Sequence, residues 1–101
     1  DMPLAVEQIS TAVPEGYILS QNYPNPFNPT TKISFTLPER AFAEIRIYDI
    51  KGSLVSVLFS KELAAGSYSA VWNSGNNSSG VYFYSLVTEN FTRTGKMMLI
   101  K

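Results

Sequence analysis

The side chains that most enzymes use for proton transfer and metal binding are missing from this sequence. Its 101 residues include neither histidine nor cysteine. Without histidine there is no Ser-His-Asp triad, and the commonest general base and transition-metal ligand are lost. Without cysteine there are no disulfides, thiolate metal sites or cysteine nucleophiles, although this does not fix the compartment. The sequence therefore predicts no catalytic residue, no metal site and no cofactor.

The acidic residues do not form a pattern that would perform chemistry. A glycosidase needs two carboxylates about 5–9 Å apart, and a calcium loop needs several oxygen ligands at short spacing. Glu44 and Asp49 lie beside one expected strand with opposite parity, about 17 Å apart along it. The asparagine-rich loop 73–77 offers oxygens, but turn formation is the favoured interpretation. We interpret the acids as solvated ends of strands.

Aromatic side chains are the remaining candidates for a binding site. The chain has one tryptophan, six tyrosines and six phenylalanines. If Tyr48, Tyr82 and Tyr84 stood exposed on a sheet, they could stack on sugars, so a carbohydrate-binding or adhesive module is the alternative function. Core packing and cross-strand pairing is the simpler interpretation. A buried Tyr82 and Tyr84 would count strongly against the sugar-binding alternative.

Composition and charge indicate one globular domain without a nucleic-acid or membrane partner. Hydrophobic residues make up 45% of the chain, charged residues make up 16%, and the formal net charge is zero. A neutral chain lacks the basic stripe that binds nucleic acid, and no apolar run reaches the roughly 18 residues of a transmembrane segment. Residues 1–4 do not resemble a signal peptide. A signal for export would therefore lie on a longer parent chain.

Alternating apolar and polar residues predict an all-β fold without helices. We expect strands at 17–19, 31–37, 43–49, 54–59, 67–72, 81–88 and 91–100. Turns are expected at Lys51-Gly52 and Glu89-Asn90, and the run 54–59 is apolar at both parities, which predicts burial on both sides or a bulge. The large side chains on both faces of 81–88 predict a central strand.

These elements fit an antiparallel, immunoglobulin-like β-sandwich of about seven strands. Trp72 is expected to fill its core. The three prolines of segment 23–29 predict an ordered, extended lead-in, from which Tyr23 and Phe27 can pack against the sandwich. We assign residues 19–101 to the sandwich and residues 1–18 to a linker from an upstream domain.

The last stretch of the chain combines positive charge with apolar residues. Arg93, Lys96 and Lys101 follow the last acidic side chain and flank the apolar run 97–100. One interpretation is protection of an edge strand by lysine. The other is a recognition tail for a receptor, including recognition by strand addition.

Five sequence blocks together resemble one known family. They are YPNPFNPTTKISFTLPE at 23–39, IRIYDIKGSLV at 45–55, AGSYSAVWN at 65–73, SGVYFYSL at 79–86 and TGKMMLIK at 94–101. In this order they resemble the type A C-terminal sorting domain of the type IX (Por) secretion system of Bacteroidetes. An immunoglobulin-like domain of the flagellar hook-capping protein shares parts of the pattern.

The resemblance implies a non-catalytic address that is recognised by an outer-membrane translocon and its shuttle protein. A passenger in the same chain would pass through the periplasm to the cell surface or the medium. A sortase-like peptidase would then cut upstream of Tyr23. The matched residues with an expected structural role are Pro24, Asn25, Pro26, Phe27, Gly52, Gly66 and Trp72. The candidates for translocon recognition are Gly80, Arg93, Lys96, Met97 and Lys101.

Overall fold

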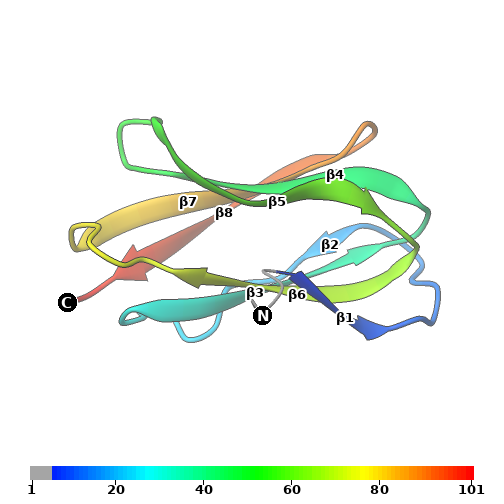
Figure 1. Ribbon diagram of the computed structural model, residues 1–101, viewed down its shortest axis with the longest axis horizontal. Coiled ribbons are helices and arrows are strands. Elements are labelled where there is room, and N and C mark those ends of the chain that lie inside the picture. The colour runs from blue at the N-terminus through cyan, green and yellow to red at the C-terminus, as the bar shows by residue number, and fades with distance from the viewer. Residues whose placement is uncertain (1–5) are drawn as a thin grey trace.

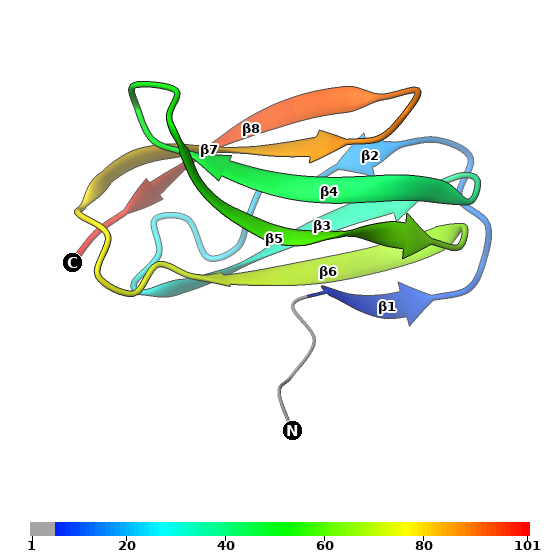
Figure 2. The ribbon, with the colours of Figure 1, turned by 45° about the horizontal axis from the view of Figure 1, so that its top comes forward.

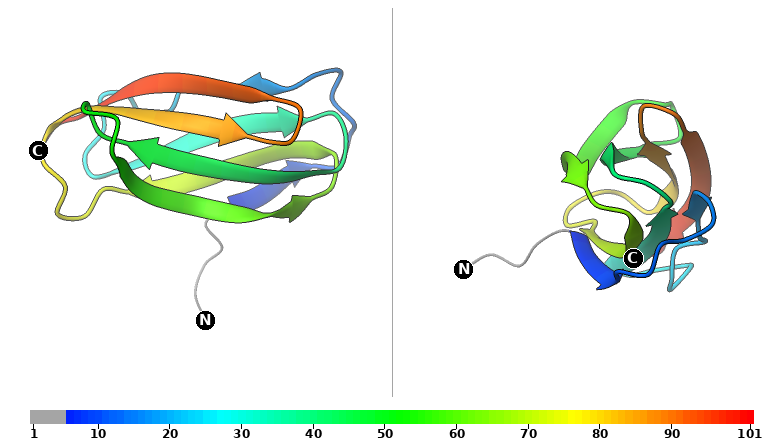
Figure 3. Two further views of the ribbon diagram at one scale, coloured as in Figure 1. Left: turned by 90° about the horizontal axis from the view of Figure 1, so that it is seen from above. Right: turned by 90° about the vertical axis from the view of Figure 1, so that its right-hand side faces the viewer.

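Apolar side chains at every second position build two facing antiparallel sheets. The structure is a computed structural model that describes residues 6–101. Its strands are β1 (Val6–Ser10), β2 (Ile18–Leu19), β3 (Thr30–Leu37), β4 (Ala41–Tyr48), β5 (Leu54–Leu63), β6 (Gly66–Asn73), β7 (Gly80–Val87) and β8 (Thr92–Leu99). Sheet A has the strand order β1-β6-β3-β2, and sheet B has the order β5-β4-β7-β8 (Figures 1 and 3).

The strand order confirms the predicted immunoglobulin-like sandwich. The chain changes sheet between β3 and β4, between β5 and β6, and between β6 and β7 (Figure 2). Strand β7 lies between β4 and β8, as its large side chains on both faces predicted. A register shift between Ile45 and Arg46 opposite β5 confirms the bulge alternative for that strand.

The core forms where the inner faces of the two sheets meet. The predicted alternation holds, because Ile33 in sheet A and Ile45 and Ile47 in sheet B are completely buried. Trp72 is buried between Phe27 and Tyr82, whose ring centroids lie 5.7 and 5.4 Å from its own. Trp72 therefore fills the core as predicted.

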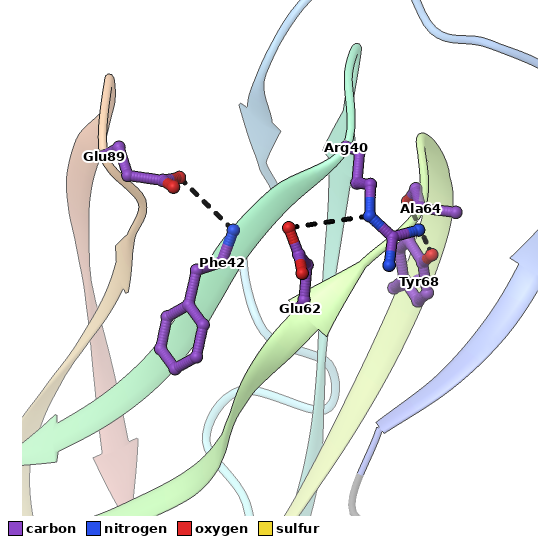
Figure 4. Close-up of polar contacts among 6 residues, drawn as sticks. All are labelled: Arg40, Phe42, Glu62, Ala64, Tyr68 and Glu89. Atoms are coloured by element: carbon purple, nitrogen blue, oxygen red, sulfur yellow. Dashed lines mark hydrogen bonds and ion pairs between the residues drawn. The ribbon is translucent and has the colours of Figure 1, made fainter.

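Two tyrosines fasten the starts of their strands to the chain upstream. The Tyr68 hydroxyl donates a hydrogen bond of 2.6 Å to the carbonyl of Ala64 (Figure 4), and the Tyr82 hydroxyl donates one of 2.7 Å to that of Ser78. Each bond reaches back four residues, as in the tyrosine corner of immunoglobulin-like sandwiches. Burial raises the pKa of Tyr68, so this hydroxyl stays a donor.

Strand β1 was not predicted. It lies within the segment 1–18 that we assigned to a linker, and it pairs with β6 through Val6 and Ala70. Val6 is its one buried side chain, so no alternating pattern marks the strand in the sequence. A side chain at Gly66 would collide with the carbonyl oxygen of Ser10, so Gly66 makes room for β1 as well as turning the chain. Residues 1–5 of the predicted linker lie outside the described residues, and the domain division stays a prediction.

The two ends of the sandwich differ in what they contain. At one end, which we call the tail end, lie the lead-in 23–29, the β4–β5 turn 49–53, the β6–β7 loop 74–79 and residues 100–101 (left in Figure 1). The opposite end, called the far end, has the turns 38–40, 64–65 and 88–91. The tail end therefore brings together parts of the sequence that lie far apart in the chain, from the lead-in to its last residue.

Candidate recognition surface

The lead-in covers the outer edge of the last strand. The N–H of Phe27 donates to the carbonyl of Met98 (3.0 Å), and the N–H of Ile100 donates to the carbonyl of Phe27 (3.0 Å). Asn25 Oδ1 accepts the N–H of Met98 (3.0 Å), and Gln21 Nε2 donates to the carbonyl of Lys96 (2.8 Å). The backbone groups that β8 turns away from β7 are therefore satisfied from the carbonyl of Lys96 onward.

A buried polar cluster holds the lead-in in this position. Asn22 is 2% exposed, and its Nδ2 donates to Thr31 Oγ1 (3.0 Å) and to the carbonyl of Pro24 (3.2 Å). Its backbone N–H donates to the hydroxyl of Tyr84 (3.1 Å), which in turn donates to the carbonyl of Ser20 (2.9 Å). Burial raises the pKa of Tyr84, so the hydroxyl keeps the proton that it donates.

Gly95 provides the space that Tyr84 occupies. A Cβ atom at position 95 would fall within 3.0 Å of the Cζ, Oη and Cε1 atoms of Tyr84. Because Tyr84 is buried and its hydroxyl is bonded to Ser20 and Asn22, just before the lead-in, the ring has little freedom to move aside. This contact was not predicted from the sequence, although a glycine inside a strand often marks such a close approach.

The aromatic residues of the lead-in behave differently from one another. Phe27 is 2% exposed and packs against Trp72, as expected. Tyr23 is 80% exposed, so the expectation that it packs against the sandwich is wrong. Its backbone pairs with Lys32 at the start of β3, and this pairing turns the side chain outward.

The predicted recognition residues are divided between the two ends. Lys101 lies at the tail end, where its Nζ donates to the carbonyl of Gly75 (2.8 Å) and its backbone N–H to Ser79 Oγ (3.0 Å). Gly80 begins β7 and pairs with Leu99. Arg93 lies near the far end, with its guanidinium 5.8 Å from the centroid of Phe91.

Lys96 and Met97 occupy opposite faces of β8. Lys96 is exposed on the outer face of sheet B, beside Phe83 of β7. Met97 is 1% exposed and belongs to the core, so in this fold its side chain is not available to a partner. Met98, which the sequence analysis did not select, is 41% exposed on the same face as Lys96.

The covered edge limits recognition by strand addition. An added strand needs a row of free N–H and C=O groups, and Gln21 and the lead-in already occupy this row from the carbonyl of Lys96 to the N–H of Ile100. The outward backbone groups of Thr92 and Thr94 have no partner among residues 6–101. Strand addition to β8 from Lys96 onward would therefore require the lead-in to be displaced.

The ionisable residues that we considered for catalysis have structural partners. Glu44 accepts hydrogen bonds from Arg46 Nε (2.6 Å) and Ser60 Oγ (2.9 Å), and these bonds lower its pKa. Asp49 Oδ1 accepts the backbone N–H groups of Lys51 and Ser53 (2.9 Å each), which fixes the β4–β5 turn. Residues 6–101 hold no group of three or more acidic side chains placed to bind a metal ion.

The tyrosines of the sugar-binding alternative do not form an exposed row. Tyr82 is 6% exposed and Tyr84 is 1% exposed, so both belong to the core. Tyr48 alone lies on the outer face, where it is half-buried. An aromatic platform for sugars would need two or three of these rings exposed together. In the described part of the chain, no helix is long and apolar enough to cross a membrane.

Comparison with known protein families matches residues 21–101 to the family described as "Secretion system C-terminal sorting domain". The match begins at Gln21, whose side chain binds β8, and it continues through β3–β8 to Lys101. It covers more than half of the chain and leaves out β1 and β2. A search of curated proteins finds no match.

Proposed function

The chain belongs to the family of type IX secretion C-terminal sorting domains, and from this premise we propose that it directs a passenger protein across the outer membrane. The passenger precedes the sandwich in one longer chain, and its destination is the cell surface or the medium. The match over residues 21–101 is the observation that carries this proposal.

The domain acts by binding and performs no chemical step. Its partners are the outer-membrane translocon and a shuttle protein, which contact exposed side chains of the folded sandwich, Lys96 and Lys101 among them. The tail end supports this role, because the lead-in and the terminal residues of the chain are fastened together there.

A sortase-like peptidase then separates the passenger from the domain. Its cut lies upstream of Tyr23, in the segment 11–16 between β1 and β2, where Val13 is 69% exposed. The residues that follow are less suitable, because Asn22 is buried and bonded to Thr31. A peptidase needs an extended, accessible chain, so it would cut the exposed segment first.

A fusion experiment tests the proposed function. We would join residues 1–101 to the C-terminus of a reporter with a periplasmic signal, in a host with a type IX system. The fused reporter should become accessible to protease on intact cells, while the reporter alone should stay in the periplasm. If both stay in the periplasm, the proposal is wrong.

Deleting the tail would not be a clean version of this experiment. Residues 96–101 include Met97 and Leu99, each of which is 1% exposed in the core. Loss of a buried side chain of this size costs about 2–5 kcal/mol, which is comparable with the stability of a small domain. A truncated chain would fail to fold whether or not the tail is recognised, so single surface substitutions are the informative variants.

A further inference from the structure

The outer faces of the two sheets differ in how their apolar side chains are grouped, because on sheet A the exposed Ile18 and Val71 pair with the polar residues Thr36 and Lys32. In sheet A, the pairs Ser34–Ser69 and Thr36–Ser67 place hydroxyl groups side by side. In sheet B, aromatic and aliphatic side chains occupy neighbouring strands around one lysine. We call this set the outer-face patch, and its members are Tyr48, Leu54, Val81, Phe83, Lys96 and Met98.

The strand register makes the outer-face patch continuous. Leu54 pairs with Tyr48, Tyr48 with Phe83, and Phe83 with Lys96, so one row crosses all four strands. Val81 and Met98 form a second pair beside this row. Leu54 is 56% exposed and Met98 is 41% exposed. Continuous exposed apolar surface of this kind is characteristic of a binding site.

Two hollows adjoin Val81, at the end of the patch nearest the tail end. One, of about 280 Å³, lies where Asn25 and Pro26 of the lead-in meet Met98. The other, of about 420 Å³, lies between the β4–β5 turn and the β6–β7 loop, with Val55 among its lining residues. The lead-in that covers the β8 edge thus also forms a wall against which a partner's side chain can pack.

The charges around the outer-face patch indicate the chemistry of its partner. Lys96 lies in the patch, and Lys51 and Lys101 lie at the adjoining tail end. Among residues 6–101, Asp49 is the acidic side chain of that end, and two backbone N–H groups occupy its Oδ1. At the far end, Glu62 pairs with Arg40 (3.5 Å), and Glu89 accepts the N–H of Phe42 (3.2 Å) (Figure 4). Although the charged side chains of the whole chain balance, lysines outnumber acidic side chains at the tail end, Lys51 and Lys101 against Asp49.

We propose that the outer-face patch docks a protein surface of the export machinery that offers apolar side chains to Val81 and Met98 and a carboxylate to Lys96. This inference rests on the proposed function and specifies the surface and the chemistry of recognition. Apolar contacts supply affinity, and the opposite charges set orientation and the rate of association. Lys96 was predicted from the sequence as a recognition residue but Met98 was not, because the apolar run 97–100 leaves the inward and outward faces of β8 undetermined.

Matched substitutions on the two outer faces test the inference. Met98→Glu on β8 would be compared with Val71→Glu on β6, because these side chains are 41% and 39% exposed. Lys96→Glu would be compared with Lys32→Glu, an exposed lysine on β3 of sheet A. Each variant of residues 1–101 would be fused to the reporter, and its protease-accessible fraction on intact cells would be measured.

We expect Met98→Glu and Lys96→Glu to lower surface delivery at least about tenfold, the loss that follows from disrupting an interface centre. Surface delivery of Val71→Glu and Lys32→Glu should stay within about twofold of wild type. The conservative variants Lys96→Arg and Met98→Leu should be delivered as well as wild type. Thermal melting of the purified variants would verify that each pair is equally folded. If a patch variant melted at a lower temperature than its control, Leu54→Gln would replace it as the patch variant.

Three results would overturn the inference while leaving the proposed function intact. In the first, wild-type delivery is normal and the Met98 and Lys96 variants are delivered equally well. In the second, the sheet A controls lose as much delivery as the patch variants. In the third, the purified chain is a dimer that Met98→Glu converts to a monomer, which makes a second copy the occupant. Failure of the wild-type fusion itself would instead refute the proposed function.

Discussion

Replacing Gly95 with alanine should destabilise the domain by displacing Tyr84. The added methyl group would lie within 3.0 Å of three atoms of Tyr84. The Tyr84 hydroxyl is bonded to Ser20 and Asn22, so the side chain cannot move aside without breaking these bonds. Overpacking of this kind costs about 1–3 kcal/mol, and each buried polar group left unpaired costs about 1–3 kcal/mol more. Removing a strand glycine returns about 0.5–1 kcal/mol. With one polar group left unpaired and the middle of each range, the expected net loss is about 3 kcal/mol.

This loss would be measured by thermal unfolding followed by circular dichroism. For a domain of about 100 residues, each kcal/mol shifts the Tm by about 4–8 °C, so Gly95→Ala should lower it by roughly 10–30 °C. Gly16→Ala is the matched control, because no atom lies within 4 Å of a Cβ at that position. The control should shift the Tm by no more than about 3 °C.

A double variant separates the steric cause from a general effect of the substitution. Tyr84→Phe removes the hydroxyl that binds Ser20 and Asn22, so those bonds cannot be lost a second time. Gly95→Ala should therefore cost less in the Tyr84→Phe background than in the wild type. If Gly95→Ala melts with the Gly16→Ala control, or if the two costs simply add, the proposed link between β8, Tyr84 and the lead-in is refuted.

Three further changes test other parts of the structure. Trp72→Ala should cost about 3–5 kcal/mol, a large part of the stability of a small domain, and lower the Tm by more than about 10 °C; a variant with wild-type Tm would contradict its place in the core. Asn25→Ala should speed amide exchange at Met98, whose N–H loses its acceptor, and unchanged exchange would show that the edge is not capped there. Glu44→Gln should flatten the fall in stability below about pH 4.5. Because the pKa of Glu44 is lower in the folded state than in the unfolded state, its carboxylate stabilises the fold at pH values above the unfolded pKa. This stabilisation is lost as the pH falls through the folded pKa. Stability that falls equally steeply with pH in wild type and variant, followed by circular dichroism, would refute this role.

Local patterning predicted most of the strands because each face of the sandwich repeats every two residues. The alternation in β3 and β4 fixed which side chains are buried, and it did so without knowledge of the partner strands. Strand β1 escaped because only Val6 of its five residues is buried. Its place is determined by backbone pairing with β6 and by the space that Gly66 leaves, and neither has a local signature.

The candidate surface could be predicted only in part for the same reason. The prolines of the lead-in predicted an extended segment, but its pairing with β8 joins residues about seventy positions apart. Parity in β8 was ambiguous because 97–100 is apolar throughout, so Met97 was chosen and Met98 was not. Gly95 was the signal that could have resolved it, because a glycine inside a strand marks close packing against the core. Met97 lies two residues later and therefore faces the core too.

The proposed function predicts that delivery of the fused reporter depends on one machine. The decisive measurement is the protease-accessible fraction of a reporter carrying residues 1–101, in one host with its type IX translocon intact and in the same host with it removed. We expect surface exposure in the first strain and complete retention in the periplasm in the second. Equal exposure in both strains would contradict recognition of this sandwich by the type IX system.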